Sequence, residues 1–121
     1  MELYFLDTYA LFELFKGNEN YNKFERNLAI ATTKLNLMEF YYTLLRIGTD
    51  NPDSYYERLL KFVVDISDDS IKKAMKFKLL HKSKELSYVD AIGYAVAAEK
   101  KAVFVTGDQQ FKDMENVEYI K

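Results

Sequence analysis

The sequence predicts an α/β fold in which a parallel sheet is covered by helices on both faces. Short apolar strand candidates alternate with helix candidates from one end of the chain to the other. The two clearest strand candidates, residues 3–6 and 102–106, are apolar almost throughout rather than alternating, as is typical of strands buried on both faces. The 121 residues suffice for one sizeable core, so we expect a single domain spanning residues 1–121.

The first strand candidate leads directly into a helix candidate. Residues Leu3–Leu6 form a short apolar run that ends at Asp7, and its length and aromatic content indicate a buried strand. Thr8–Lys16 has the apolar spacing of a helix, and Gly17 follows where a helix would end. A second short helix is expected over Asn20–Asn27.

The middle of the chain continues the alternation. Residues Leu28–Thr32 form a short strand candidate, and a longer helix is expected to begin at Asn36 and to end at Gly48. Asn51 followed by a proline indicates the start of the next helix, which is expected to run to about Phe62.

The last half of the chain is expected to contain two further helices and the remaining strands. Ser67 and the two acids after it are predicted to cap a lysine-rich helix that ends at about Lys82. Ser87 opens another helix through Ala98. The other expected elements are a short strand over Val63–Ile66, a buried strand over Ala102–Thr106, a helical turn over Phe111–Met114 and a final strand over Val117–Ile120.

Composition excludes several classes of site. The chain has no cysteine, which rules out disulfides, thiolate zinc sites and a cysteine nucleophile, and its one histidine, His81, rules out a multi-histidine metal site. The net charge of −2 is no basic excess of the kind typical of nucleic-acid binders. No apolar run approaches the roughly 18 residues of a transmembrane helix, and the N-terminus does not resemble a signal peptide. We therefore expect a cytoplasmic protein without membrane contact.

Four carboxylates fall where ligands bind in open α/β sheets, which is outside the carboxyl ends of the strands. Asp7 directly follows the first strand candidate, and Asp108 lies two residues after the strand candidate 102–106. Glu39 and Asp90 each fall in the first turn of a predicted helix, the end that packs near the strand tips. We expect the four side chains to converge on one pocket.

A cluster of this kind favours a cation, because neighbouring carboxylates repel one another and otherwise take up protons. Mg²⁺ and Mn²⁺ prefer oxygen ligands, and an oxygen-only site is the one type of metal site that this composition supports. One such ion can activate water, and two of them ~3.5–4 Å apart can clamp the attacking and leaving oxygens of a phosphodiester.

Each acid also has a purely structural interpretation. The spacings Asn36–Glu39 and Ser87–Asp90 resemble capping boxes, in which an acid three residues after the cap bonds back to it. Asp7 could cap the first helix, and Asp108 could be a turn residue. The two interpretations are compatible, since an acid near a helix start can cap the helix and still present an oxygen to a metal.

The segments around these acids resemble the PIN-domain family of metal-dependent ribonucleases, most closely the small VapC-type toxins of prokaryotic toxin–antitoxin modules. The family's opening strand resembles residues 4–11 (YFLDTYAL), its glutamate-bearing helix start residues 36–39 (NLME), its third motif residues 86–91 (LSYVDA), and its fourth motif residues 103–111 (VFVTGDQQF). The motifs keep their order and spacing over essentially the whole chain.

The resemblance implies a three-layer α/β/α sandwich around a parallel sheet of about five strands. It implies a Mg²⁺- or Mn²⁺-dependent endoribonuclease that uses metal-activated water, with Asp7, Glu39, Asp90 and Asp108 as the metal-binding and catalytic residues. Thr106 matches a Ser or Thr position near the site. The short chain favours a toxin held in check by an antitoxin protein.

The only basic concentration lies between Ile71 and Lys84, a stretch without acids. Within it, Lys72, Lys73 and Lys76 are candidates for contacting the phosphates of an RNA substrate, and a solvated helix face is the alternative. His81 lies in the same stretch, where a surface position is favoured over a catalytic one.

Aromatic residues are numerous on the first helices. Core packing explains most of the first group, but some could form an exposed groove for an amphipathic helix of a partner: Tyr9, Phe12, Phe15, Tyr21 and Phe24. Adjacent tyrosine pairs recur on the two helices in the middle of the chain, at 41–42 and 55–56. One member of each pair is expected to point away from the core, which favours a homodimer.

Three other functions compete with a toxin ribonuclease. The chain could be a non-enzymatic RNA-binding PIN domain or a PIN nuclease in RNA processing, although four intact acids favour an active toxin-type enzyme. A phosphoryl-transfer domain ranks lower. A receiver would need adjacent acids after the first strand, and an aspartyl phosphatase would need a second aspartate where Tyr9 stands.

Overall fold

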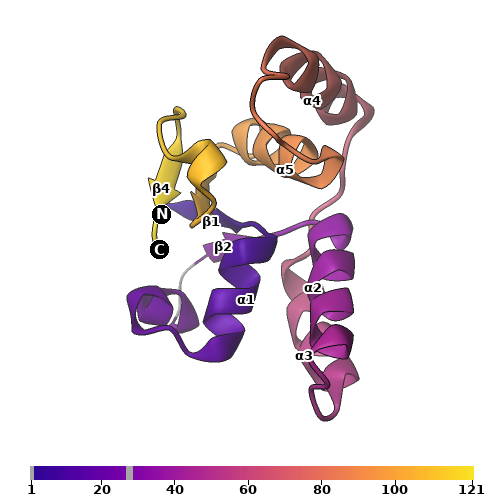
Figure 1. Cartoon of the computed structure of the whole chain (residues 1–121), viewed down its shortest axis with the longest axis vertical. Coiled ribbons are helices and arrows are strands. Elements are labelled where there is room, and N and C mark those ends of the chain that lie inside the picture. Colours follow the sequence, from indigo (N-terminus) through magenta and orange to yellow (C-terminus); the bar gives the residue numbers. More distant parts are fainter. Residues whose placement is uncertain (1, 27–28) are drawn as a thin grey trace.

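A computed structural model of the chain describes residues 2–26 and 29–121. The predicted ends of one helix and one strand, at Asn27 and Leu28, lie outside the described residues. Within those residues the core is a parallel sheet of four strands in the order β2-β1-β3-β4 (Figure 1). The strands are β1 (Leu3–Leu6), β2 (Ala29–Ala31), β3 (Val103–Thr106) and β4 (Val117–Tyr119).

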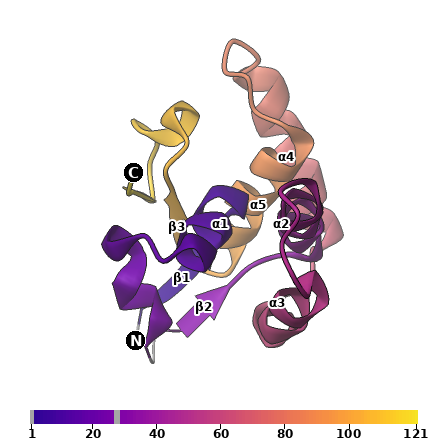
Figure 2. The same ribbon diagram turned by 60° about the horizontal axis from the view of Figure 1, so that its bottom comes forward.

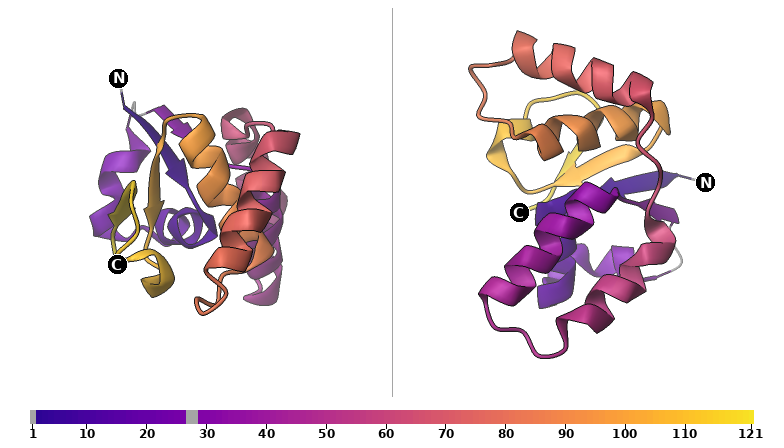
Figure 3. Two further views of the ribbon diagram at one scale, coloured as in Figure 1. Left: turned by 90° about the horizontal axis from the view of Figure 1, so that it is seen from above. Right: turned by 90° about the vertical axis from the view of Figure 1, so that its right-hand side faces the viewer.

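All strand pairs in this sheet are parallel, so their carboxyl ends share one edge. The register places Phe5 beside Phe104 and Leu6 beside Val105. The arrowheads of β1 and β3 accordingly point the same way (Figure 3, left). Any residue that follows β1 or β3 therefore lies at the same edge of the sheet.

The fifth predicted strand, Val63–Ile66, is reduced to a single parallel bridge between Val63 and Thr32. Two hydrogen bonds flank this bridge: Thr32 N–H donates to the Phe62 carbonyl (3.0 Å) and Val64 N–H donates to the Thr32 carbonyl (2.9 Å). The segment thus lies alongside the β2 edge of the sheet but leaves it after one pair. The predicted α/β fold with about five parallel strands is confirmed with this one shortened edge.

One face of the sheet is covered by the helices of the first half of the chain (Figure 2). These are α1 (Thr8–Lys16), the 3₁₀ helix η1 (Glu19–Glu25), α2 (Lys34–Arg46), α3 (Pro52–Leu59) and the 3₁₀ turn η2 (Leu60–Phe62). Leu6 and Val105 point from the strands into this layer and pack on Leu11, Leu37 and Phe40. Gly17 ends α1 in the left-handed conformation (φ 78°), which glycine adopts without a steric penalty.

The other face is covered by α5 (Tyr88–Glu99) and the 3₁₀ turn η3 (Gln109–Phe111), and α4 (Asp68–Leu80) packs on the outside of α5 (Figure 3, right). Phe5 and Phe104 point into this layer with their rings stacked at 5.6 Å. Buried alanines of α5 let the helix lie close to the strands. The sheet is therefore buried on both faces, which is why β1 and β3 read as almost continuous apolar runs.

Some predicted boundaries differ from those of the structure. The helix expected to begin at Asn36 begins at Lys34, because Thr33 is its N-cap and accepts a hydrogen bond from Asn36 N–H at 3.2 Å. The helix expected to reach Lys82 ends at Leu80. The helical turn expected over Phe111–Met114 is present, since Met114 N–H donates to the Phe111 carbonyl at 3.0 Å, and it continues η3, which begins two residues earlier where Asp108 caps it. No helix among the described residues is long and apolar enough to span a membrane.

Candidate active site

Asp7 occupies the carboxyl end of β1, at the junction with α1. Only 3% of the residue is exposed. Its carboxylate accepts a hydrogen bond from Ala10 N–H at 2.8 Å and so caps α1, and its own N–H donates to the Val105 carbonyl at 3.3 Å. The end of β1, the start of α1 and the end of β3 therefore hold this carboxylate in one position.

Burial raises the pKa of Asp7 to about 7. The Thr106 hydroxyl and the Ala10 N–H stabilise the carboxylate and oppose this rise, whereas the negative charges of Asp90 and Asp108 add to it. Among the described residues no lysine, arginine or histidine lies within ion-pair distance of Asp7. Asp7 is thus a desolvated carboxylate that feels the negative charges of Asp90 and Asp108 and has no cationic partner in the described part of the chain.

Asp108 follows β3 through Thr106 and Gly107. The Thr106 hydroxyl accepts from Asp108 N–H at 3.0 Å, and the Asp108 carboxylate accepts from Gln110 N–H at 3.0 Å to cap η3. Gly107 has no room for a side chain, since an added Cβ would lie 2.2 Å from the Tyr9 ring. Thr106 therefore bridges the two strand-end acids, with its side chain touching Asp7 and the backbone of Asp108.

Asp90 lies in the first turn of α5 and forms the predicted capping box. Ser87 N–H donates to the Asp90 carboxylate at 3.0 Å, and Asp90 N–H donates to the Ser87 hydroxyl at 3.0 Å. Burial raises the pKa of Asp90, and the charge of Asp108 adds to the rise. The hydrogen bonds from Ser87 and the positive charge of Lys78 oppose it. The capping role was predicted. In addition, Asp90 interacts electrostatically with both strand-end acids, Asp7 and Asp108.

Glu39 reaches the same region by a different route. It lies in the second turn of α2, not in the first turn as predicted, because the helix begins earlier. The Thr8 hydroxyl donates to the Glu39 carboxylate at 2.6 Å, and the side-chain amide of Asn36 donates to the same hydroxyl at 3.1 Å. Thr8 directly follows Asp7, so this relay ties Glu39 to the end of β1.

Sequence reasoning missed this relay. Asn36 was interpreted as an N-cap but is 1% exposed, and its amide oxygen accepts from the Thr33 hydroxyl at 2.7 Å. A polar Thr-x-x-Asn pattern immediately before an apolar helix face was the available signal for a different cap. Thr8, the residue after the first acid, carried no separate signal.

Three of the four predicted acids therefore influence one another electrostatically, and the fourth joins them through Thr8. Within residues 2–26 and 29–121, however, no three carboxylate or imidazole side chains are gathered into a metal-binding arrangement. Each carboxylate is turned toward a hydrogen bond from its own neighbourhood: Ala10 for Asp7, Thr8 for Glu39, Ser87 for Asp90 and Gln110 for Asp108.

The chemistry of this donor set fits a hard divalent cation. Every side chain in it offers oxygen, which Mg²⁺ and Mn²⁺ prefer. The buried Asp7 carboxylate with its raised pKa is stabilised by any cation that enters between it and its acidic neighbours. The residues that would hold such an ion are Asp7, Asp90 and Asp108, with Glu39 on the α2 side.

A family model for the PIN domain matches residues 4–117. The chain belongs to the PIN-domain family. This family is one of nucleases, and its members are in general dependent on divalent metal. The acids at the carboxyl edge of the sheet are therefore the part of this PIN domain to consider for nuclease chemistry.

The fold is similar to solved toxin structures. VapC20 of Mycobacterium tuberculosis, described as a sarcin-ricin loop cleaving toxin, superimposes with a TM-score of 0.79 at 19% identity, over 99% of this chain and 100% of that one. VapBC2 of Rickettsia felis, bound to a promoter DNA fragment, gives 0.75 at 21% identity over 98% and 99%. A toxin–antitoxin complex from Klebsiella pneumoniae gives 0.75 at 18% identity over 97% and 99%. No curated protein sequence matches the chain.

The predicted phosphate-binding lysines lie on α4, which runs antiparallel to α5. The Ser67 hydroxyl bonds to Glu99 at one end of the helix pair (2.6 Å), and Lys78 bonds to the Leu86 carbonyl at the other (2.8 Å). The first turns of α4 therefore lie at the end of α5 remote from Asp90. Three exposed lysines stand on these turns and the one after them, namely Lys72, Lys73 and Lys76.

Two residues of the basic stretch have partners that limit their roles. Lys73 forms an ion pair with Asp69 at 2.9 Å on the exposed side of α4. The His81 imidazole bonds to the Phe77 carbonyl at 3.0 Å and lies 4.3 Å from the Phe77 ring. These contacts of His81 do not reach the four acids, and its non-catalytic position stays a prediction.

The aromatic residues near the N-terminus are mainly core residues of this PIN domain. Tyr21 and Phe24 are buried, whereas Tyr9, Phe12 and Phe15 are half-buried against the same cluster. The pair at 41–42 separates as predicted. Tyr41 bonds to Asp53 on α3, and Tyr42 is 66% exposed. The pair at 55–56 does not separate, because both rings are half-buried.

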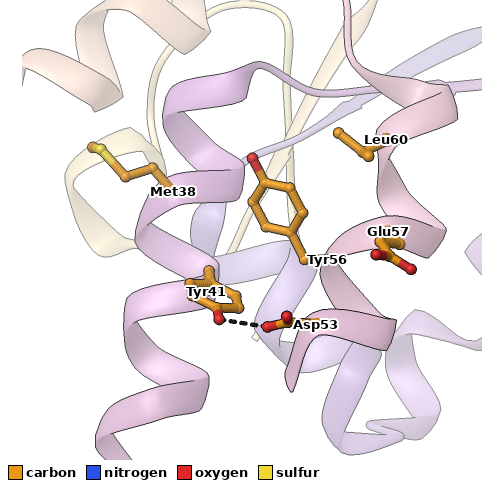
Figure 4. A pocket seen from close by; sticks show the side chains of 6 residues that line it. All are labelled: Met38, Tyr41, Asp53, Tyr56, Glu57 and Leu60. Atoms are coloured by element: carbon orange, nitrogen blue, oxygen red, sulfur yellow. Dashed lines mark hydrogen bonds between the residues drawn. The ribbon is translucent and has the colours of Figure 1, made fainter. Parts of the chain in front are cut away.

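Two open grooves flank α2. The first, of about 490 Å³, lies between α2 and α3 and is lined by Met38, Tyr41, Asp53, Tyr56, Glu57 and Leu60 (Figure 4). The second, of about 620 Å³, contains Thr8 and Glu39 together with Met38, Tyr42, Thr43 and Arg46. The second groove therefore opens directly onto the Glu39 side of the candidate site.

Proposed function

We propose that this PIN domain is a Mg²⁺- or Mn²⁺-dependent endoribonuclease and the toxin of a toxin–antitoxin pair. The observation that supports it best is the buried Asp7 carboxylate at the strand edge, which has no ion-pair partner among the described residues and feels the negative charges of Asp90 and Asp108. Burial of a carboxylate without a cation lowers the stability of the fold, and such buried acids are typical of functional sites. The PIN-domain family is one of nucleases.

The chain's own residues would position the ligands of the metal. Thr106 and Ala10 N–H hold the Asp7 carboxylate, Ser87 orients Asp90, and Thr8 orients Glu39. When bound, a divalent ion supplies activated water and neutralises the charge that develops on the phosphodiester oxygens. The covered sheet edge excludes bulk water from Asp7, which strengthens its attraction for a cation.

The toxin assignment is supported by the structural neighbours, which include a sarcin-ricin loop cleaving toxin and two toxin–antitoxin complexes. We propose an antitoxin protein and a second copy of the chain as partners. The exposed Tyr42 and the grooves beside α2 are the surfaces that best suit such contacts.

The experiment is a cleavage assay on end-labelled RNA with Mg²⁺, with Mn²⁺ and with excess EDTA. Cleavage is expected with either metal and not with EDTA. Asp7→Asn is expected to lower the rate by roughly 10²–10³-fold, the scale for losing one electrostatic catalytic group. Asp50→Asn, which neutralises an exposed acid in the turn after α2, is the matched control and should cleave like the unmodified chain.

The outcomes separate the alternatives. Cleavage that persists after exhaustive chelation would contradict a metal mechanism. RNA binding without cleavage under all metal conditions would indicate a non-enzymatic RNA-binding PIN domain. Cleavage that does not arrest growth when the chain is expressed alone, compared with Asp7→Asn, would point to RNA processing instead of toxicity.

A further inference from the structure

The loop between α4 and α5 leads to the helix that carries Asp90 and is bonded to the turn that Asp108 caps. Its Lys84 ammonium donates to the Gln110 carbonyl at 3.0 Å, and Glu85 N–H donates to the Gln110 side-chain oxygen at 3.3 Å. Gln110 N–H in turn donates to Asp108. The loop is thereby fastened to η3, and Lys84 is held at the Asp108 end of the site.

Tyr88 follows this loop as the first residue of α5. The residue is 66% exposed, although it lies only two positions before Asp90. The Lys78 ammonium lies 4.9 Å from the centre of its ring and donates to the Leu86 carbonyl at 2.8 Å. One face of the ring therefore carries a fixed positive charge, and much of the ring remains open to solvent.

Lys78 lies at the Asp90 end of α5, since its ammonium donates to the carbonyl of Leu86, the residue before the N-cap Ser87. An ammonium has three donors, and the Leu86 carbonyl uses one of them, so the others remain available to a phosphate. The basic stretch from residue 71 to 84 contains six lysines and no acid. Of these, Lys78 and Lys84 are the two that backbone carbonyls hold at the active-site end of α4.

An exposed aromatic ring beside fixed lysines has a specific use next to a phosphodiester-cleaving centre. Bases that are not already stacked in a duplex stack on aromatic side chains, and lysines bind the adjoining phosphates. A base inside a helix cannot use such a ring without leaving its own stack. The juxtaposition therefore suits an unpaired nucleotide.

We propose that Tyr88, Lys78 and Lys84 form a subsite for one unstacked nucleotide of an RNA strand next to the phosphodiester at the acid cluster. The base stacks on the Tyr88 ring, and the adjoining phosphates bind the two lysines. This subsite rests on the proposed ribonuclease function and adds substrate-positioning residues to it. It favours loops and single strands over duplexes.

The test measures binding apart from chemistry. A fluorescein-labelled single-stranded RNA of 12 nucleotides and mixed sequence is titrated with the chain carrying Glu39→Gln in Mg²⁺, and a gel confirms that the RNA stays intact. Tyr88→Leu in this background is expected to weaken binding roughly 5- to 100-fold, the range for losing one stacked base. Tyr88→Phe, which keeps the ring, should bind like its parent.

Lysine variants test the second half of the subsite. Lys78→Met is expected to weaken binding and to lower the salt slope by about 0.7, the value for one single-strand phosphate contact, whereas Tyr88→Leu should leave the slope unchanged. Lys61→Met is the matched control. The Lys61 ammonium lies 5.2 Å from the centre of the Phe62 ring in η2. The substitution Lys61→Met therefore removes a similar cation–aromatic contact that is away from the acids.

A scan of abasic nucleotides along the same RNA identifies the stacked base. At one position the abasic RNA should bind as weakly as the intact RNA binds Tyr88→Leu, and Tyr88→Leu should cause no further loss on it. Equal losses at all positions, or unchanged RNA affinity for Tyr88→Leu and Lys78→Met, would overturn the subsite.

The outcomes distinguish this proposal from the proposed function. If the unmodified chain cleaves RNA and Tyr88→Leu has the same RNA affinity and cleavage rate, the subsite fails and the nuclease stands. If no metal supports cleavage but Tyr88→Leu and one abasic position weaken binding without additivity, the subsite stands and the nuclease fails. Thermal unfolding of each variant verifies that it is folded.

Discussion

Asp7 and Asp90 both accept hydrogen bonds at the start of a helix, yet their surroundings differ. Asp7 caps α1 from a position that is 3% exposed, without a lysine or arginine in ion-pair distance among the described residues. Asp90 completes a capping box with Ser87 near the surface, and the charge of Lys78 supports its ionised form. Hydrogen bonding at a helix start therefore accompanies a larger desolvation cost at Asp7 than at Asp90. Capping alone accounts for Asp90 but leaves the burial of Asp7 unexplained.

The largest expected effect is a pH-dependent loss of stability at Asp7 in EDTA. The pKa is about 7 in the folded chain and 3.8 when unperturbed, so between these values the folded state binds more protons. Stability must therefore fall as pH rises from about 4 to about 7, by up to about 4 kcal/mol, and remain low above that range. Chemical denaturation in EDTA across this range measures it.

Asp7→Asn is the variant that isolates this contribution. Its amide oxygen can still accept from Ala10 N–H, so the cap is retained while the charge is removed. The variant should match the unmodified chain near pH 4 and exceed its stability above pH 7. A constant difference between the two across the whole range would show that Asp7 carries no unusual penalty.

The next effect concerns the Thr8 relay, which connects the Asp7 region to Glu39 and does not include Asp90. Thr8→Val removes the bond to Glu39 and leaves the buried Asn36 amide without its acceptor. Stability should fall by about 1–3 kcal/mol and cleavage by roughly 10–100-fold, the scales for an unsatisfied buried group and for a lost orienting contact. Thr8→Ser keeps the hydroxyl and is expected to retain both properties. Unchanged cleavage by a folded Thr8→Val would separate Glu39 from the site.

At Asp90 the loss of the acid should lower stability, which is the opposite of the effect expected for Asp7→Asn. Asp90→Ala removes the capping acid and is expected to lower stability by about 0.5–2 kcal/mol. Asp90→Asn keeps an oxygen for Ser87 N–H and should change stability little. Both should abolish cleavage if Asp90 also serves the metal. Thermal melts read alongside cleavage rates distinguish these roles, and a destabilised but fully active Asp90→Ala would leave capping as its only function.

The smallest expected effect tests whether the charge that matters lies at the Asp90 end of α4. Replacing Lys72, Lys73 and Lys76 together with glutamine should weaken RNA binding by less than about 3-fold, through long-range attraction alone. Lys73 is already paired with Asp69. Anisotropy titrations beside Lys78→Met measure the contrast. A larger loss in the triple variant than in Lys78→Met would place the RNA along the outer face of α4.

The sequence was sufficient where local signals and burial agree. The bounds Leu3–Leu6 and Thr8–Lys16 match β1 and α1, because an apolar run, a capping acid and Gly17 coincide there. Asp7 and Asp108 fall at one edge because their strands are parallel. The strand expected over Val63–Ile66 fails because only Val63 pairs with the sheet, and periodicity alone does not reveal where pairing stops.

The rest of the candidate site depends on tertiary packing. The Thr8 relay requires the Asn36 side chain to point inward, which follows from a helix start at Thr33 that the sequence pattern left ambiguous. Which end of α4 lies near Asp90 depends on the antiparallel packing of α4 on α5. The contact of Lys78 with Tyr88 therefore could not be predicted from the number of lysines in the sequence.

The tight packing at Gly107 has a consequence for how this chain can change over generations. An added Cβ would overlap the Tyr9 ring at 2.2 Å and the Ile120 carbonyl oxygen at 2.6 Å. Tyr9 belongs to the helix that Asp7 caps, and the Ile120 N–H is bonded to the Thr106 carbonyl. A substitution at this one position would thus disturb the first helix and the last strand together. Position 107 should therefore tolerate substitution less well than most exposed positions of the chain.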